Sequence, residues 1–220
     1  MILQMTICGI KQTLPGVYQI TSESGSAFFL RTRYLKLVKE NRFDSILKNS
    51  NSFLECEDGN VLNQNEFSEE EYADILSAAL TFSAEAAAMT YLARAEQCRF
   101  LLTQKLVHKG IDKSNIKEAL DYLEEVHYLD DSRFAEVWLR SRAIDHAEGR
   151  IKLTSELSSR GIDRSISKAA LDDFFTSHHE IDLCKEAYEK LVRQKVKPEK
   201  IEQSLRNKGF TMNEIKTIVN

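Results

Sequence analysis

LTSELSSRGI, at residues 153–162, is the stretch that decides the fold of this 220-residue chain. Its pattern recurs as LTQKLVHKGI at residues 102–111 and as IEQSLRNKGF at residues 201–210. In each copy, two apolar residues four positions apart precede a cation, a glycine and a further apolar residue. The glycines recur roughly every fifty residues, a period typical of stacked helical repeats. The chain therefore contains three copies of one structural unit.

Each copy has the pattern of one helix ending and the next one beginning. The apolar pair marks a helical face, and the cation complements the negative end of the helix dipole. The residues predicted to end these helices in the left-handed conformation are Gly110, Gly161 and Gly209. A capping residue follows in each copy, namely Asp112, Asp163 or Thr211. Asp130 and Asp131 are both predicted as N-terminal caps of the helix upstream of the second copy.

Counting a helical segment upstream of each copy, the unit is three helices in about fifty residues. The predicted fold is therefore mainly α, with three tandem three-helix repeats that follow a small α+β segment containing strands. We place the N-terminal segment at residues 1–83 and the repeats at residues 84–130, 131–177 and 178–220.

The hydrophobic pattern of the N-terminal segment is typical of strands. Short β-branched or aromatic runs at residues 6–10, 17–20 and 27–30 are separated by turn residues, which predicts three antiparallel strands. One or two short helices are expected over residues 34–48, and a short strand at residues 53–55.

A long helix is predicted to begin at Ser68, because Ser68 and Glu71 form a capping-box pattern. We expect it to run through Ala79 and to break before Ala84. No apolar run approaches the ~20 residues that span a bilayer, and the start of the chain lacks the pattern of a signal peptide. We therefore expect a cytoplasmic protein without a membrane contact.

The composition and motifs argue against catalytic and metal-binding functions. The four cysteines lie far apart, and no histidine stands at metal-ligand spacing from them. The sequence has no phosphate-binding glycine loop and no nucleophile elbow. We predict a non-enzymatic protein with no catalytic residue, no metal and no cofactor.

From the second copy outward, the sequence resembles the RecX family. The segments that carry the resemblance are YLDDSRFA at residues 128–135, RSR at 140–142, GRI at 149–151 and RGI at 160–162. YLAR at residues 91–94, with the KGI of the first copy, is similar to the family's first repeat, and the third copy stands where its third repeat belongs. The resemblance covers about residues 87–220.

RecX proteins are bacterial regulators of the RecA recombinase. The resemblance implies a protein without catalytic activity that binds along the groove of the RecA filament on DNA. It further implies lower recombinase, ATPase and co-protease activity of RecA, with consequences for homologous recombination, DNA repair and the SOS response. Contact with single-stranded DNA would be weak or would occur through RecA, and we expect the chain to be a monomer.

Basic residues of the first two repeats are the candidate contacts with RecA carboxylates or DNA phosphates. Arg133 and Arg140 are seven positions apart and share a helical face. The alternative for any one cation is a solvated surface with pairs such as Glu136 and Arg140. Tyr128 and Trp138 are expected to pack in the core. The full set of candidates is Arg94, Arg99, Arg133, Arg140, Arg142, Arg150, Lys152 and Arg160.

Two other classes of function are compatible with the helical pattern. A helix-turn-helix DNA-binding regulator would place the helix after each glycine in the major groove. Residues 112–125 carry more acidic than basic side chains, so phosphates would repel that helix. A generic helical-repeat scaffold for another protein also fits. The net charge of −4 further disfavours direct DNA binding, although the last two repeats are mildly basic.

Overall fold

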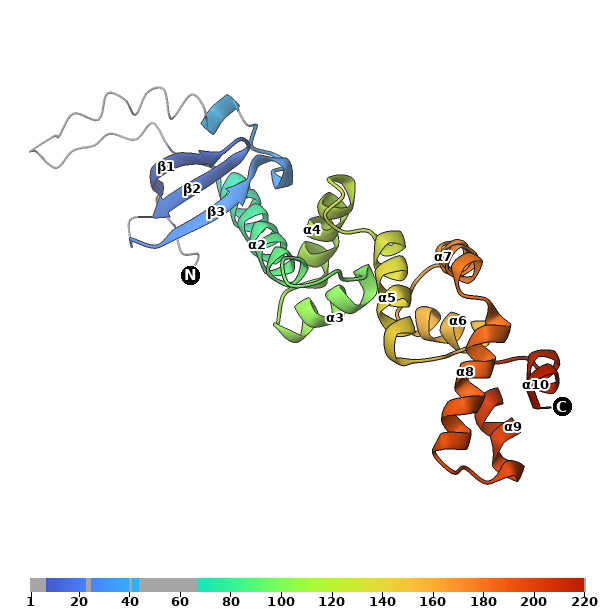
Figure 1. Ribbon diagram of the computed structural model, residues 1–220. Coiled ribbons are helices and arrows are strands. Elements are labelled where there is room, and N and C mark those ends of the chain that lie inside the picture. The colour runs from blue at the N-terminus through green and yellow to red at the C-terminus, as the bar shows by residue number, and fades with distance from the viewer. Residues whose placement is uncertain (1–6, 23–24, 40, 44–66, 220) are drawn as a thin grey trace, which may run out of the picture. The chain divides into compact units, whose positions relative to one another are not determined.

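The computed structural model describes residues 7–22, 25–39, 41–43 and 67–219 (Figure 1). The chain packs as two compact units. Of the described residues, the first unit combines those up to Thr90 with residues 106–123, and the second combines residues 91–105 with residues 124–219.

The first unit contains an antiparallel three-stranded sheet, which confirms the predicted strands. Strands β1 (Ile7–Leu14), β2 (Val17–Ser22) and β3 (Ala27–Arg31) are hydrogen-bonded in that order. Gly16 turns the chain between β1 and β2 with a φ of 70°, a conformation that favours glycine. The predicted strand at residues 53–55 lies outside the described residues.

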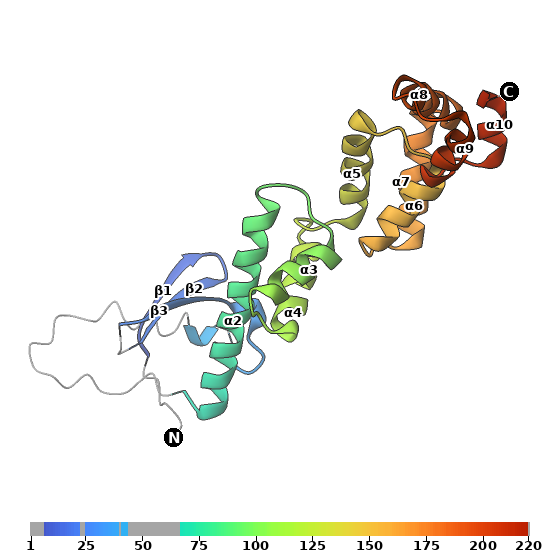
Figure 2. The same ribbon diagram turned by 90° about the horizontal axis from the view of Figure 1, so that it is seen from below.

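Helix α2 (Glu69–Leu92) forms the hydrophobic core of this unit together with the sheet (Figures 1 and 2). Tyr18, Ile20 and Leu30 point from β2 and β3 into the core, where they cluster with Ile75 and Ala78 of α2. From Tyr18 to Ser22, buried and half-buried side chains alternate along β2, as expected for a strand with one face on the core.

Two buried carboxylates of α2 hold the segment that follows β3. The Asp74 carboxylate accepts hydrogen bonds from the amides of Lys36, Leu37 and Val38 at 2.8–3.1 Å. The Glu85 carboxylate accepts hydrogen bonds from the Arg31 guanidinium and from the Tyr34 hydroxyl, whose oxygen lies 2.7 Å from Glu85 Oε2. The short 3₁₀ helix η1 (Thr32–Tyr34) is thereby fixed against α2. Of the helices expected over residues 34–48, the described part shows only one helical turn at residues 41–43.

The predicted start of α2 is correct, but the predicted break is wrong. The Ser68 amide donates to the Glu71 carboxylate at 2.8 Å, and the Glu71 amide donates to the Ser68 hydroxyl at 3.2 Å. The helix then continues without interruption through Ala84, since this alanine-rich stretch favours helix and contains no glycine or proline. The predicted boundary at residue 84 therefore falls inside a continuous helix.

Helix α2 also corrects the expectation that no segment could span a bilayer. By length and composition alone, Glu69–Leu92 is long and apolar enough to do so. Asp74, Thr81 and Glu85 are nevertheless buried on it and hydrogen-bonded to other parts of the first unit. Such polar contacts are those of a core helix in a globular unit.

The remaining helices form the repeats and confirm the mainly α fold. The second and third repeats have three helices each, whereas the first shares the end of α2. These helices are α3 (Arg99–His108), α4 (Lys113–Glu125), α5 (Asp131–Asp145), α6 (Arg150–Ser159), α7 (Arg164–Ser177), α8 (Glu180–Arg193), α9 (Pro198–Asn207) and α10 (Met212–Val219).

The three motif glycines end α3, α6 and α9 in the same way. Gly110, Gly161 and Gly209 have φ values of 79°, 72° and 88°. Each glycine amide donates to the carbonyl three residues earlier, and the next residue donates to the carbonyl five residues earlier. This pair of bonds is the Schellman motif, which satisfies the last carbonyls of a helix.

Asp130 rather than Asp131 caps α5. The Asp130 carboxylate accepts from the amides of Ser132 and Arg133, at 2.8 and 3.1 Å. Asp131 is the first helical residue, and its carboxylate instead accepts from the Arg99 amide at 2.8 Å. The Asp131 carboxylate therefore provides a hydrogen-bond acceptor for a free backbone amide at the start of α3, and not for its own helix.

One apolar core joins the second and third repeats. It includes Leu139 of α5, Leu157 of α6, Leu171 of α7, Cys184 of α8 and Leu205 of α9. Trp138 packs partly buried against this core, whereas the expectation for Tyr128 is wrong, since 56% of that residue is exposed.

The middle helices of successive repeats are stacked end to end. Where α9 ends on α6, the Gly149 amide donates to the Lys208 carbonyl at 2.9 Å. At the equivalent position one repeat earlier, the Cys98 thiol donates to the Arg160 carbonyl at 3.3 Å. The negative end of one helix dipole thus meets the positive end of the next, and terminal backbone groups gain partners.

Candidate partner-binding surface

Most of the predicted contact cations form ion pairs within the protein. The pairs and their shortest N–O distances are Arg99–Glu124 at 2.5 Å, Arg133–Glu96 at 2.6 Å, Arg142–Glu148 at 2.7 Å, Arg150–Asp172 at 2.6 Å, Lys152–Glu148 at 2.7 Å and Arg160–Glu156 at 2.7 Å.

Several of these pairs connect different helices. Arg150 at the start of α6 binds Asp172 of α7 and Glu180 of α8, the latter at 2.8 Å. Arg133 also donates to the carbonyls of His127 and Tyr128, and so fixes the turn before α5. These guanidinium groups already have structural roles, so a partner would have to share them or displace their carboxylates.

Arg140 and Arg94 differ from the other candidates. The Arg140 side chain is 67% exposed, and its contact with Glu136 is a long one of 3.9 Å. Arg94 is exposed, and within the described part of the chain its side chain makes no hydrogen bond or ion pair. Both guanidinium groups are therefore available to a partner at little cost to the fold.

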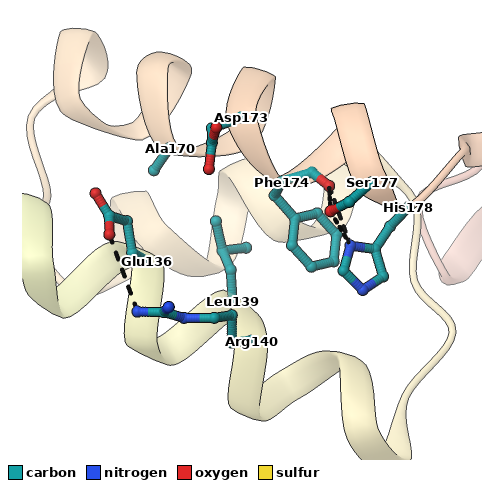
Figure 3. Close-up of a pocket in the computed structure, with 8 residues that line it drawn as sticks. All are labelled: Glu136, Leu139, Arg140, Ala170, Asp173, Phe174, Ser177 and His178. Carbon is teal, nitrogen blue, oxygen red and sulfur yellow. Dashed lines mark hydrogen bonds and ion pairs between the residues drawn. The ribbon is translucent and has the colours of Figure 1, made fainter.

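Arg140 lies on the rim of a small pocket between α5 and α7 (Figure 3). The pocket has a volume of about 140 Å³. Apolar atoms of Leu139, Ala170 and Phe174 line it, and His178 stacks on the Phe174 ring with the centroids 4.3 Å apart. Its remaining lining residues are Glu136, Asp173 and Ser177. The pocket lining thus carries one cation and two carboxylates. Such a lining would repel a phosphate, and it suits a side chain of a protein partner better.

The outward face of α5 carries exposed apolar side chains beside Arg140. Val137 is 38% exposed and Ile144 is 80% exposed, and the spacing of residues 137, 140 and 144 places all three side chains along one helical stripe. Exposed apolar groups interleaved with arginine are typical of protein interfaces. We call Val137, Arg140 and Ile144 the α5 face and take it as the candidate contact with a protein partner.

A second cluster surrounds the loop between α5 and α6, and sequence reasoning found only part of it. Glu148 is 3% exposed and binds both Arg142 and Lys152. Burial by itself would raise the pKa of the Glu148 carboxyl, but hydrogen bonds from the two cations outweigh burial and lower that pKa to about 2. Lys190 of α8 and Lys208 at the end of α9 complete the cluster, which no spacing in the sequence indicated.

The would-be recognition helix and the cysteines show no sign of a binding or metal site. Lys117, on the would-be recognition helix α4, pairs with Asp121 at 2.8 Å. Cys98 and Cys184 are free and buried, and burial raises the pKa of each thiol. Among the described residues, no three His, Cys, Asp or Glu side chains gather as metal ligands.

The fold defines a helical-repeat protein, a class whose extended surfaces suit the binding of other macromolecules. The model of the protein family described as "RecX, second three-helix domain" matches residues 130–171 of this chain. The regulatory protein RecX of Treponema pallidum (strain Nichols) is 32% identical over 143 residues, which cover 65% of this chain and 87% of that protein. The chain therefore belongs to the RecX family, whose members are named regulatory proteins.

Further relatives and solved structures agree with this assignment. The RecX protein of Chlorobaculum tepidum is 32% identical over 137 residues, covering 60% of this chain and 83% of the relative. A crystal structure of regulatory protein RecX shares the fold, with a TM-score of 0.69 and 22% identity over 97% of this chain and 98% of that chain. The crystal structure of RecX from Lactobacillus salivarius gives a TM-score of 0.55 at 27% identity, over 64% of this chain and 94% of that one.

Proposed function

We propose that this protein binds the RecA filament on DNA and lowers the recombinase, ATPase and co-protease activities of RecA. It would thereby act in homologous recombination, DNA repair and SOS control, in the cytoplasm and as a monomer. The observation that carries the proposal is the 32% identity with regulatory RecX proteins over most of their length. The partner's identity follows from family membership, and the geometry suggests which surface makes the contact.

The α5 face is the proposed contact with RecA. Its apolar side chains are exposed, and its arginine has only a weak internal pair, so a partner can bind it without breaking the repeat. RecA filaments present the same surface many times, and a chain of repeats can gain avidity from neighbouring subunits. A small contact per repeat is therefore sufficient.

The double variant Arg140→Glu with Ile144→Asp tests this contact. We expect the concentration that half-inhibits RecA ATPase to rise about tenfold or more, the effect of removing one well-packed group from an interface. The melting temperature should hardly change, because both side chains are exposed. Charge reversal at Arg133 or Arg150 is a poorer test, since it would also break an ion pair within the protein, with Glu96 or Glu180 respectively.

Arg164→Glu is the matched control, because Arg164 is an exposed arginine at the start of α7. It repeats the charge change of Arg140→Glu in the same repeat and should leave inhibition within about twofold of wild type. Equal losses in the two variants would show a general charge effect. Full inhibition by a folded Arg140→Glu, Ile144→Asp protein would remove the α5 face from the proposal.

A further inference from the structure

Four cations converge on the junction between the second and third repeats. Arg142 at the end of α5 and Lys152 in α6 both bind the buried Glu148 carboxylate. Lys190 of α8 donates to the Asp145 carbonyl at 3.3 Å, just before the same loop. Lys208 caps the end of α9, where its carbonyl accepts from the Gly149 amide at the start of α6. We call Arg142, Lys152, Lys190 and Lys208 the junction cluster.

The junction cluster has more positive charge than its single buried carboxylate can balance. Arg142 and Lys152 together use both oxygens of Glu148. The Lys190 ammonium has a carbonyl partner, which carries no full charge. The Lys208 ammonium makes no hydrogen bond or ion pair among the residues that the structure describes. In a chain with a net charge of −4, this is a local excess of positive charge.

The excess charge lies on a contact that holds two repeats together. The Gly149 amide donates to the Lys208 carbonyl at 2.9 Å, and the Ile151 amide donates to the Gly209 carbonyl at 3.3 Å. Repulsion between Lys152 on one side and Lys208 on the other opposes this docking. An anion bound between them would remove the repulsion and add charge-assisted hydrogen bonds to both repeats.

The surroundings of Lys208 favour the binding of an anion. Burial lowers the pKa of its ammonium group; Glu148 raises that pKa, whereas Lys152, Lys190 and Arg142 lower it further. The net direction is downward, so the charged form of Lys208 is less stable here than in water. A bound anion would stabilise the charged form.

We propose that the junction cluster binds one backbone phosphate of a nucleic-acid strand, and that this phosphate fastens the third repeat to the second. The groups left for a ligand are ammonium groups, because the Arg142 guanidinium is held in a fork by Glu148. Ammonium groups are compact point charges, and lysine binds phosphate in this way in phosphate-binding loops. The inference goes beyond the proposed function, because the site would bind a strand in the absence of RecA.

Binding of a fluorescein-labelled oligothymidylate, measured by fluorescence anisotropy at low salt without RecA, tests the site. The double variant Lys190→Gln with Lys208→Gln should bind at least about fivefold more weakly, and the slope of log affinity against log salt should become shallower by roughly 0.7 for each phosphate that the variant no longer neutralises. The control Lys168→Gln, with Lys185→Gln, removes two exposed lysines outside the cluster and should bind like wild type.

Glu148→Gln provides a variant with the opposite sign. Removing the carboxylate increases the local positive charge, so strand binding should tighten, whereas a merely structural role for the cluster predicts no such gain. If Glu148→Gln fails to fold, the lysine pair and the salt slope still decide the question. Hydrogen exchange adds a second readout, in which the oligonucleotide should protect α9 amides in wild type and not in the lysine double variant.

Equal losses in the two lysine double variants would overturn the site, and so would competition by a polyglutamate peptide as strong as that by unlabelled oligonucleotide. Because RecA is absent, failure here leaves the proposed function standing. Loss of RecA inhibition in the α5-face variant likewise leaves this site standing, so the two proposals fail separately.

Discussion

Gly209→Ala is expected to lower the free energy of unfolding by about 3 kcal/mol, well above the cost of the same change at Gly110. Part of the cost is conformational, since a φ of 88° disfavours an L side chain by roughly 1 kcal/mol or more. The larger part is steric. A Cβ on Gly209 would stand 2.3 Å from the Lys152 amide nitrogen, which is backbone and cannot rotate away. The end of α9 would have to move off α6.

Gly110→Ala is the matched control, because Gly110 has the same helix-ending role with a φ of 79°. Nothing lies within 4 Å of the Cβ that it would gain, so only the conformational cost of roughly 1 kcal/mol applies. Chemical unfolding followed by circular dichroism measures both variants. Equal destabilisation by the two changes would contradict the stacking of α9 on α6.

Glu148→Gln is expected to cost about 3 kcal/mol of stability at neutral pH. The Glu148 carboxylate is buried and is the shared counter-charge of Arg142 and Lys152. The amide is of the same size but leaves two partly buried cations without a counter-charge, and breaking a buried pair in this way costs roughly 3–5 kcal/mol. The partial exposure of both cations puts the estimate at the low end of that range.

The same carboxylate makes a prediction about acid stability. The pKa of Glu148 is lower in the folded protein, about 2, than the ordinary value of 4.5 expected for the unfolded chain. Its contribution is therefore fully present above pH 4.5 and is lost as the pH falls towards 2. Glu148→Gln should lack this component, so the wild-type and variant stabilities should converge in acid. The control Glu202→Gln changes an exposed residue and should keep the wild-type profile.

The repeat ends were predictable because their determinants are local. A left-handed glycine, the cation before it and the capping residue after it lie within a few positions of one another, and all three copies form the same Schellman motif. The capping box of Ser68 and Glu71 could be predicted for the same reason. The continuity of α2 was misjudged because alanine-rich sequence supports helix even where the apolar pattern changes.

The binding surface was only partly predictable, because its availability depends on partners that are distant in sequence. Arg133 and Arg140 looked equivalent in the sequence. In the structure Arg133 is held by Glu96, whereas Arg140 keeps an exposed guanidinium. The same holds for the junction cluster, since the charges of Lys208 and Glu148 influence each other only when the third repeat docks on the second. Helical periodicity shows which face a residue occupies, but tertiary packing decides which charges that face can still offer.

ATP hydrolysis by RecA on single-stranded DNA, titrated with this protein, is the measurement that tests the central claim most directly. We expect the hydrolysis rate to fall as the protein is added and to approach a low plateau, with the Arg140→Glu, Ile144→Asp variant shifting the titration to higher concentration. A RecA hydrolysis rate that stays constant up to a large molar excess of the folded wild-type protein would contradict the account.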